Sequence, residues 1–389
     1  MLRWHKPSLN KPAIPPFEAT AEGRTRHLNR VLERERVRAD RSGRPLALVL
    51  VGYDGGLRGG RRSGEQTIVE ALRQRCRITD EVGWFDRRTG FAVLPDTDSA
   101  GGDLFARSVQ EYLSRQGAKI SFAVYQYGPD DPDRGLNAGG RAGEGAGERR
   151  ADRMPLPAAP TVSDTAPAVA GRINAAEPAA SRPLETVMAR PLPWWKRATD
   201  IAVASVGLIA ASPVLLVAAA AIKLDSPGPV IFKQQRAGLG NVPFGIWKFR
   251  TMCADAERRR SEVVGNNELD GPAFKQKNDP RITRVGAFLR KTSVDELPQL
   301  VNILKGDMTL VGPRPLPVIE SDACRPWQRR RLEVTPGLTC IWQVWGRQGV
   351  TFDQWMRMDL RYSGRRTFPH DVKIMLHTVP AVLKQRGAC

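Results

Sequence analysis

Residues 201–222 read IAVASVGLIAASPVLLVAAAAI and contain no charged side chain. This apolar stretch constrains the fold of the second half of the chain. A helix of about 20 apolar residues is long enough to cross the hydrocarbon core of a bilayer. Ser212 and Pro213 stand at the middle of this stretch. Proline removes one backbone hydrogen bond from a helix and bends it, so we expect an apolar helix that is broken at this pair.

Basic residues flank the apolar stretch on both sides, with Lys196 and Arg197 before it and Lys223 after it. Lys and Arg are enriched on the cytoplasmic side of membrane segments, so both ends favour the cytoplasm. A re-entrant helix that turns back at Ser212-Pro213 satisfies the length and the charges, with the rest of the domain on the cytoplasmic face of the inner membrane. A straight span satisfies the length alone, and a buried helix of a soluble protein is the remaining alternative.

The chain of 389 residues carries 60 Lys and Arg against 41 Asp and Glu, a formal charge of +19. This excess favours an anionic partner, which can be nucleic acid, an anionic membrane surface or a phosphorylated substrate. No helix-turn-helix, zinc-finger or RNP-type aromatic motif is visible, so we do not expect nucleic acid. The five cysteines have no CxxC spacing, which favours reduced thiols. Residues 1–16 lack an apolar run, so we expect no signal peptide.

Hydrophobic and turn patterns divide the chain into three parts. Residues 25–128 show the order β-α-β-β-α-β, which is typical of a ferredoxin-like α/β domain. Residues 129–190 are rich in Gly, Ala, Pro, Asp and Arg and have no hydrophobic period, so we expect a flexible, disordered linker. Residues 191–389 hold the chemistry, in a second α/β domain that includes the apolar helix.

Lys248 and Arg250 alternate with Trp247 and Phe249. This alternation predicts that both cations lie on one face of a strand. Two neighbouring cations suit the two phosphates of a diphosphate. A solvated strand face is the alternative, since charged residues are common on surfaces.

Asp295 and Glu296 form a pair of adjacent carboxylates. Ser293 and Glu296 fit the S-x-x-E capping box of a helix start, although Pro298 would lie in its second turn. The dipole at a helix start favours anions. Neighbouring helical residues point about 100° apart, so one carboxylate can attack phosphorus while the other holds Mg²⁺, which takes one or two carboxylates plus phosphate oxygens. A pair that only decorates a helix end is the alternative.

Arg314 lies in the sequence Gly312-Pro313-Arg314-Pro315. Prolines restrict the backbone, so an arginine in this turn loses little entropy when it binds a ligand. A guanidinium held in this way can bind a phosphate through two hydrogen bonds. The alternative is a surface turn whose arginine is solvated.

Together these motifs give residues 194–389 a resemblance to the bacterial sugar transferase family. Its members are the monotopic polyprenyl-phosphate phosphoglycosyl transferases that prime exopolysaccharide and O-antigen assembly. Besides the Ser-Pro helix, the matching motifs are KFRTM at 248–252, DELPQL at 295–300, KGDM at 305–308, VGPRP at 311–315, PGLT at 336–339 and WQV at 342–344.

The resemblance implies transfer of a sugar-1-phosphate from a UDP-sugar to polyprenyl (undecaprenyl) phosphate, with release of UMP. Asp295 would be the nucleophile and form a phosphosugar-aspartate intermediate. Glu296 would bind Mg²⁺, and Arg314 would hold a phosphate. Supporting substrate contacts would come from four residues: Lys248, Arg250, Asp279 and Arg281. The lipid bilayer is a further partner, because polyprenyl phosphate would attack from the membrane side.

The sequence departs from the family at two positions, where Cys340 replaces the usual glycine and Trp345 a common serine. Both leave the choice of sugar open. Residues 352–361 have helical spacing with apolar and basic faces, which suits an interfacial helix or a packing helix. Asp359 would fall on the apolar side of that helix.

Residues 46–127 also resemble a degenerate GGDEF-type nucleotide cyclase domain, on element order and on the segment from Arg77 to Phe85. The hairpin that carries the acidic motif of that family reads RRTGF at 87–91 here, so we expect no cyclase activity. A membrane-tethered nucleotide-sensing protein with an inactive transferase domain is therefore the second function to weigh. Release of UMP separates the two, and membrane fractionation separates both from a nucleic-acid binder. The sequence leaves open whether a homo-oligomer forms.

Overall fold

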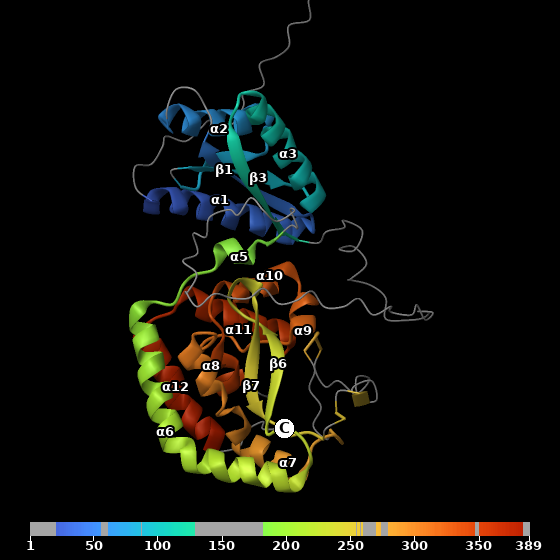
Figure 1. Ribbon diagram of the computed structural model, residues 1–389, viewed down its shortest axis with the longest axis vertical. Coiled ribbons are helices and arrows are strands. Elements are labelled where there is room, and N and C mark those ends of the chain that lie inside the picture. The colour runs from blue at the N-terminus through green and yellow to red at the C-terminus, as the bar shows by residue number, and fades with distance from the viewer. Residues whose placement is uncertain are drawn as a thin grey trace, which may run out of the picture. The chain divides into compact units, whose positions relative to one another are not determined.

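The structure is a computed structural model that divides into two compact units, Met1–Leu184 and Glu185–Cys389. Both units are mixed α/β (Figure 1). The residues that the structure describes are 21–55, 61–86, 88–128, 182–253, 255–256, 258–259, 270–273, 279–346 and 350–383.

The first unit contains a five-stranded sheet in the order β2-β3-β1-β4-β5. Its elements are α1 (Ala21–Ser42), β1 (Leu46–Gly55), α2 (Arg61–Arg75), β2 (Glu81–Trp84), β3 (Thr89–Pro95), α3 (Ser99–Arg115), β4 (Lys119–Tyr127) and β5 (Arg182–Pro183). This is the β-α-β-β-α-β order that the sequence predicts for residues 25–128, preceded by one helix. The central strand β1 pairs antiparallel with β3 and with β4.

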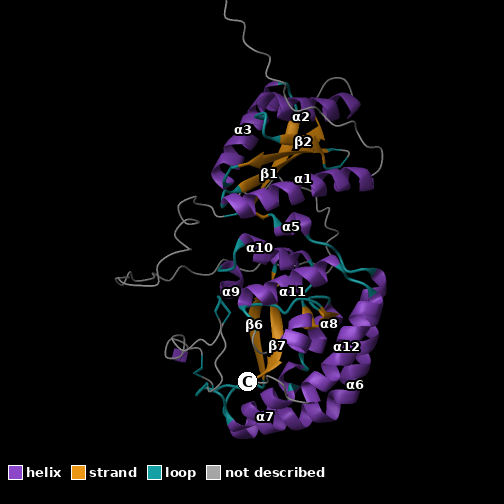
Figure 2. Ribbon diagram, turned by 180° about the vertical axis from the view of Figure 1, so that it is seen from behind, coloured by secondary structure: helices purple, strands orange, loops and turns teal. Residues whose placement is uncertain are grey.

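Burial on both faces explains why β1 is a continuous apolar run rather than an alternating one. Its residues Ala47, Val49 and Val51 pack in one core with apolar side chains of α2 and α3. The intervening Leu48 and Leu50 are also buried. Figure 2 shows α1 on the side of the strands opposite to α2.

The predicted linker 129–190 lies outside the described residues as far as residue 181. The residues that follow differ from the expectation, because Arg182 and Pro183 form β5 and pair parallel with β4. Leu184 is buried, and residues Glu185–Met188 form helix α5. One strand of two residues has no hydrophobic period, so its addition to a sheet edge is not visible in the sequence.

The second unit combines a β-hairpin, a short parallel strand pair and many helices. Strands β6 and β7 pair antiparallel, and β8 and β9 pair parallel. The elements are α6 (Trp194–Asp225), β6 (Ile231–Ala237), η1 (Leu239–Asn241), β7 (Pro243–Phe249), α7 (Arg284–Thr292), η4 (Val294–Glu296), α8 (Gln299–Lys305), β8 (Thr309–Val311), α9 (Val318–Asp322), α10 (Pro326–Arg329), η5 (Arg330–Glu333), β9 (Gly337–Thr339), η6 (Trp342–Gly346), α11 (Phe352–Gly364) and α12 (Phe368–Leu383).

Helix α6 contains the apolar stretch and has 32 residues, with Pro213 in its interior. It is long and apolar enough to cross a membrane, and only 11% of its most apolar window is buried inside the protein. Large apolar side chains such as Val206, Ile209 and Leu216 are exposed. Figure 1 shows that α6 changes direction along its length, so that one limb runs down the side of the unit and the other beneath it. An internal proline accounts for such a bend.

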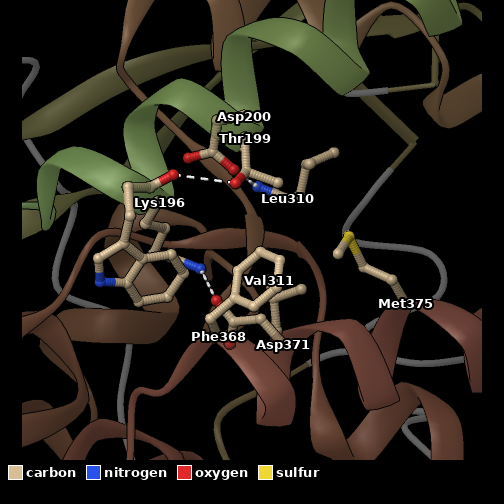
Figure 3. A pocket seen from close by; sticks show the side chains of 9 residues that line it. Lys196, Thr199, Asp200, Leu310, Val311, Phe368, Asp371 and Met375 are labelled. Atoms are coloured by element: carbon tan, nitrogen blue, oxygen red, sulfur yellow. Dashed lines mark hydrogen bonds and ion pairs between the residues drawn. The ribbon is translucent and has the colours of Figure 1, made fainter.

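The basic residues before the apolar stretch are used inside the protein. Lys196 is only 2% exposed and donates to Asp371 at 2.5 Å, as Figure 3 shows. Arg197 donates to the carbonyl groups of Ile303 and Leu304 at 2.5 and 2.7 Å, at the C-terminal end of α8. These two cations therefore seat the start of α6 on the rest of the unit, in addition to any role as markers of the cytoplasmic side.

Helix α11 contains the whole amphipathic segment 352–361. Its apolar residues Phe352, Trp355 and Met356 are buried in a core cluster. Asp359 is buried as well, and it forms an ion pair with Arg331. The packing interpretation of this segment is therefore confirmed and the interfacial one is wrong, because a buried arginine accounts for the acidic residue on the apolar side.

Candidate active site

The two adjacent carboxylates lie between two helices. Ser293 ends α7 in the left-handed conformation (φ 58°), and the 3₁₀ turn η4 then carries Asp295 and Glu296. Pro298 precedes the first residue of α8. The predicted capping box is wrong, because the Ser293 side chain makes no capping hydrogen bond. Proline, which needs no N–H partner at a helix start, leads into α8 instead.

Glu296 is held by two cations from different parts of the unit. Its Oε1 accepts from Nζ of Lys248 at 2.9 Å and from the guanidinium of Arg314 at 2.5 Å. A second guanidinium nitrogen of Arg314 lies 3.3 Å from Oε2. Strand β7 supplies the lysine and the turn after β8 supplies the arginine, so the structure brings together three residues that the sequence singled out.

These charges decide the protonation of Glu296. Burial raises the pKa of its carboxyl, but the charges of Arg314 and Lys248 and their hydrogen bonds outweigh burial and hold the pKa well below its usual range. Burial lowers the pKa of Lys248, and the negative charge of Glu296 acts in the opposite sense. Glu296 is therefore ionised at every pH near neutrality.

Asp295 lies beside this ion cluster but is not part of it. Its side chain is buried, with 8% of the residue exposed. Within the part of the chain that the structure describes, the carboxylate has no hydrogen-bond or ion-pair partner. Burial, followed by the negative charge of Glu296, raises its pKa from the usual 3.8 to about 6. An unbonded carboxylate with a raised pKa is the more reactive member of the pair.

Asn302 aligns the two elements that carry Lys248 and Glu296. Its side-chain oxygen accepts from the backbone N–H of Trp247 at 2.9 Å, and its amide donates to the carbonyl of Gly245 at 2.8 Å. The side chain is completely buried. Helix α8 is thereby docked against β7. No sequence pattern points to this residue, since a single Asn in a short helix is not distinctive.

Asp279 and Arg281 pair with each other rather than with Glu296. The guanidinium of Arg281 donates to both carboxylate oxygens, at 2.9 and 2.7 Å. Hydrogen bonds from Arg281 are the main reason that the pKa of Asp279 lies below its usual value. Both were predicted to contact substrate, and the structure gives them a contact with each other.

Arg290 is the cation that the sequence analysis missed. Its Nε donates to the hydroxyl of Thr251 at 3.0 Å. Burial lowers its pKa, and the negative charges of Asp295 and Asp279 counteract this effect. The guanidinium therefore lies in the field of both the free carboxylate and the Asp279–Arg281 pair. The sequence feature that could have identified Arg290 is its position five residues before Asp295, in the last turn of α7.

Arg250 lies away from the carboxylates, at the end of α6. One guanidinium nitrogen donates to the carbonyl and the hydroxyl of Ser226, at 2.6 and 3.0 Å. Strand β7 ends at Phe249, and the backbone N–H of Arg250 still donates to the carbonyl of Val230 at 2.9 Å. Arg250 therefore holds the C-terminal end of the apolar helix while Lys248 contacts Glu296, and a joint role of the two cations at a diphosphate stays a prediction.

The two departures from the family pattern differ in exposure. Cys340 is buried, and its Sγ lies 3.3 Å from the side-chain oxygen of Gln343. Trp345 is exposed on the π-helical turn η6, and its ring lies 5.3 Å from that of His377. Only Trp345 therefore presents a large surface to a ligand.

Comparison with known proteins gives a match over the second unit. The model of the family described as "Bacterial sugar transferase" matches residues 192–385. Galactosyl transferase CpsE of Streptococcus agalactiae is 43% identical over 194 residues, which cover 50% of this chain and 43% of that protein. UDP-glucose:undecaprenyl-phosphate glucose-1-phosphate transferase of Caulobacter vibrioides is 43% identical, with 50% and 71% covered. Exopolysaccharide production protein ExoY of Sinorhizobium fredii is 36% identical, with 53% and 93% covered.

The chain thus spans less than half of the length of CpsE but nearly all of ExoY. A "DGC protein" of Thermotoga maritima is similar in structure to 29% of this chain, with 88% of its own length covered, 18% identity and a TM-score of 0.25. That score carries no argument, so the GGDEF resemblance of the first unit stays a prediction.

Proposed function

The chain belongs to the bacterial sugar transferase family, and from this premise we propose that it transfers a sugar-1-phosphate from a UDP-sugar to polyprenyl phosphate. The names of two relatives, UDP-glucose:undecaprenyl-phosphate glucose-1-phosphate transferase and undecaprenyl-phosphate galactose phosphotransferase, support this reaction type. One observation carries the proposal. Asp295 is buried and unbonded within the described residues, next to a glutamate fixed by Lys248 and Arg314.

In the first step, an oxygen of the Asp295 carboxylate attacks the β-phosphorus of the UDP-sugar. The bond between this phosphorus and the bridging oxygen breaks, and UMP leaves with the electron pair. The product is a phosphosugar-aspartate. The raised pKa of Asp295 supports this role, because a carboxylate that is not stabilised by hydrogen bonds is the better nucleophile.

In the second step, a phosphate oxygen of polyprenyl phosphate attacks the same phosphorus. The phosphorus–aspartate bond breaks and returns the carboxylate of Asp295, so the enzyme is regenerated. Arg290 and Arg314 are the cations proposed to balance the charge that builds up on the phosphoryl oxygens, since preorganised donors stabilise such charge. Both interact electrostatically with Asp295.

Mg²⁺ belongs to the proposal as a cofactor, and the residues present fit it. The ion needs only one or two carboxylates besides phosphate and water oxygens. Among the described residues, Oε2 of Glu296 makes one 3.3 Å contact, with Arg314, and so can accept a further ligand. No cluster of three or more His, Cys, Asp or Glu exists among the described residues, so substrate and water would complete the shell. Held by Glu296, the ion would supply positive charge to the diphosphate.

A re-entrant α6 at the cytoplasmic face of the inner membrane completes the proposal, because it keeps the site at the level of lipid phosphates. The internal Pro213 and the change of direction of α6 support it. The test uses single cysteines at Trp194 and Leu224, which are both highly exposed, in a cysteine-free background. We expect an impermeant reagent to label both from the cytoplasmic side, and labelling from opposite sides would exclude re-entry.

The decisive experiment measures UMP release from a panel of UDP-sugars with Mg²⁺ and polyprenyl phosphate. Wild-type protein is compared with Asp295→Asn and with Asp322→Asn, the same substitution at an exposed aspartate. We expect release with at least one donor from the wild type and Asp322→Asn, and none from Asp295→Asn. Release that persists in folded Asp295→Asn would refute the nucleophile. No release with any donor would favour the nucleotide-sensing alternative.

A donor labelled in its sugar tests the intermediate directly. Without polyprenyl phosphate, the label should stay on the wild-type protein after acid quenching and map to a peptide that contains Asp295. Adding polyprenyl phosphate before the quench should remove the label. Product formation without any labelled protein at early times would favour direct transfer between the two substrates.

A further inference from the structure

The turn that carries Arg314 is held through its carbonyl groups, because Pro313 and Pro315 have no N–H to donate. The carbonyl of Pro313 accepts from a backbone N–H of β9 at 2.9 Å. The carbonyl of Pro315 accepts from the guanidinium of Arg236 at 3.0 Å. The carbonyl between them, that of Arg314 itself, accepts from the guanidinium of Arg331. Three consecutive carbonyls therefore each have a donor, and the central donor belongs to Arg331.

A buried carboxylate in turn holds Arg331 in place. It is 2% exposed, and Asp359 of α11, which accepts from it, is 1% exposed. Nε and one terminal nitrogen of the guanidinium lie 2.9 and 2.8 Å from the same carboxylate oxygen. That terminal nitrogen is also the donor to the Arg314 carbonyl. One guanidinium nitrogen therefore bridges the buried carboxylate and the turn.

Desolvation of two charges offsets most of the attraction within a buried ion pair, so such a pair contributes little net stability. A bridge of this kind does fix geometry, because the planar guanidinium presents its donors at set angles. The backbone of Arg314 cannot shift without breaking this bridge. Its side chain reaches Glu296 from that backbone, at 2.5 Å.

We infer that Arg331 is a positioning residue, which acts through the Arg314 carbonyl to set where the Arg314 guanidinium meets Glu296. The inference rests on the proposed function, in which Arg314 and Glu296 handle the phosphate. Asp359 holds the guanidinium of Arg331 in place, so α11 takes part in shaping a site to which it contributes no catalytic group.

Arg331→Lys is the informative substitution, since lysine keeps a positive charge for Asp359 but lacks the planar fork that reaches the Arg314 carbonyl as well. We expect kcat for UMP release to fall about 10-fold to 100-fold, because misplacement of a catalytic group by about 1 Å has effects of this size. KM should change less than threefold. Arg361→Lys, an exposed arginine on α11, is the matched control and should behave like the wild type.

A double-mutant cycle with Arg314→Lys separates positioning from general structural damage. If Arg331 acts through Arg314, Arg331→Lys should cost less than threefold once Arg314 is already lysine. An equal loss in both backgrounds, or full activity of Arg331→Lys alone, would overturn the inference. Inactive wild-type protein would count against the proposed function instead.

Hydrogen exchange tests the same inference without any activity. The amides of Gly312 and Arg314 lie in the turn, and the former donates to the carbonyl of Thr339 at 3.0 Å. In Arg331→Lys, a peptide spanning residues 309–316 should exchange about 10-fold faster, because local opening exposes its amides. In Arg361→Lys it should be unchanged. Unaltered exchange in Arg331→Lys would show that the turn does not depend on Arg331.

Discussion

Replacement of Asp295 by Asn should make the folded protein more stable at neutral pH. The side chain is buried, and burial together with the charge of Glu296 raises its pKa from 3.8 to about 6. A carboxyl with a raised pKa binds its proton more tightly in the folded state than in the unfolded one. Its ionised form therefore weakens the fold above pH 6, and this penalty disappears as the pH falls towards 4. Asn has nearly the same shape and no charge.

The size of the gain follows from the pKa. Each pKa unit corresponds to about 1.4 kcal/mol, so full ionisation costs the fold about 3 kcal/mol at pH 7.5. At pH 4.5 the carboxyl is mostly protonated in the folded state, and the cost to the free energy of unfolding is about 1 kcal/mol. For a unit of this size about 1 kcal/mol shifts the unfolding midpoint by about 2–4 °C, so Asp295→Asn should gain about 6–12 °C at pH 7.5. This is an upper bound, because water and side chains relax around a buried charge.

Thermal unfolding of the full chain in nanodiscs, followed by tryptophan fluorescence at pH 7.5 and 4.5, measures the gain. Glu296→Gln provides a control of opposite sign, because the pKa of Glu296 is lowered and its charge stabilises the fold. Asp322→Asn, at an exposed position, should leave the midpoint unchanged. No gain for Asp295→Asn at pH 7.5, or the same gain at both pH values, would refute the electrostatic argument.

Three further predictions concern the same unit. UMP release should decline as the pH falls through about 6, because the raised pKa of Asp295 leaves the carboxyl protonated below it; a pH profile of kcat/KM that is flat from 5 to 8 would contradict this. Asn302→Ala should lower the free energy of unfolding by about 1–3 kcal/mol, because half-buried backbone groups of β7 lose the partners that this fully buried side chain provides, as measured by urea titration; a loss below about 0.5 kcal/mol would contradict it. Gly312→Ala should prevent correct folding, since its Cβ would lie 2.6 Å from the carbonyl oxygen of Thr335; a native circular dichroism spectrum and midpoint would refute that expectation.

The sequence predicted most of the elements and the core of the site. The apolar run at 46–53 identified a buried central strand, and the charge-free stretch 201–222 identified the long apolar helix. Motif order also picked out Lys248 and Arg314, which the structure brings to Glu296. These predictions succeed because hydrophobic period and residue type are local properties of the chain.

Side-chain contacts between residues far apart in the sequence were harder to predict. Arg250 was predicted to contact substrate together with Lys248, and in the structure its guanidinium contacts Ser226 at the end of α6. Arg290 was missed, because its relation to Asp295 depends on how α7 ends in a left-handed serine. A single sequence does not show where a strand stops or how a helix end turns, and both are decided by tertiary packing.

The contacts that hold α6 against the rest of the unit limit how the length of this helix can change in evolution. Lys196, Arg197 and Asp200 bind other elements of the unit, and the last accepts from Thr309 and the backbone N–H of Leu310 at 3.0 and 2.9 Å. A residue inserted between Lys196 and Asp200 would rotate the positions on its two sides by about 100° relative to each other, so that the contacts of Lys196 and of Asp200 could not form together. An insertion after Asp200 keeps these contacts in register but displaces Ile222 and Ser226 at the other end of the helix, whose carbonyl groups accept from Arg250. The number of residues between Lys196 and Ser226 is therefore expected to stay constant among relatives, while the exposed apolar side chains between these two ends are free to vary.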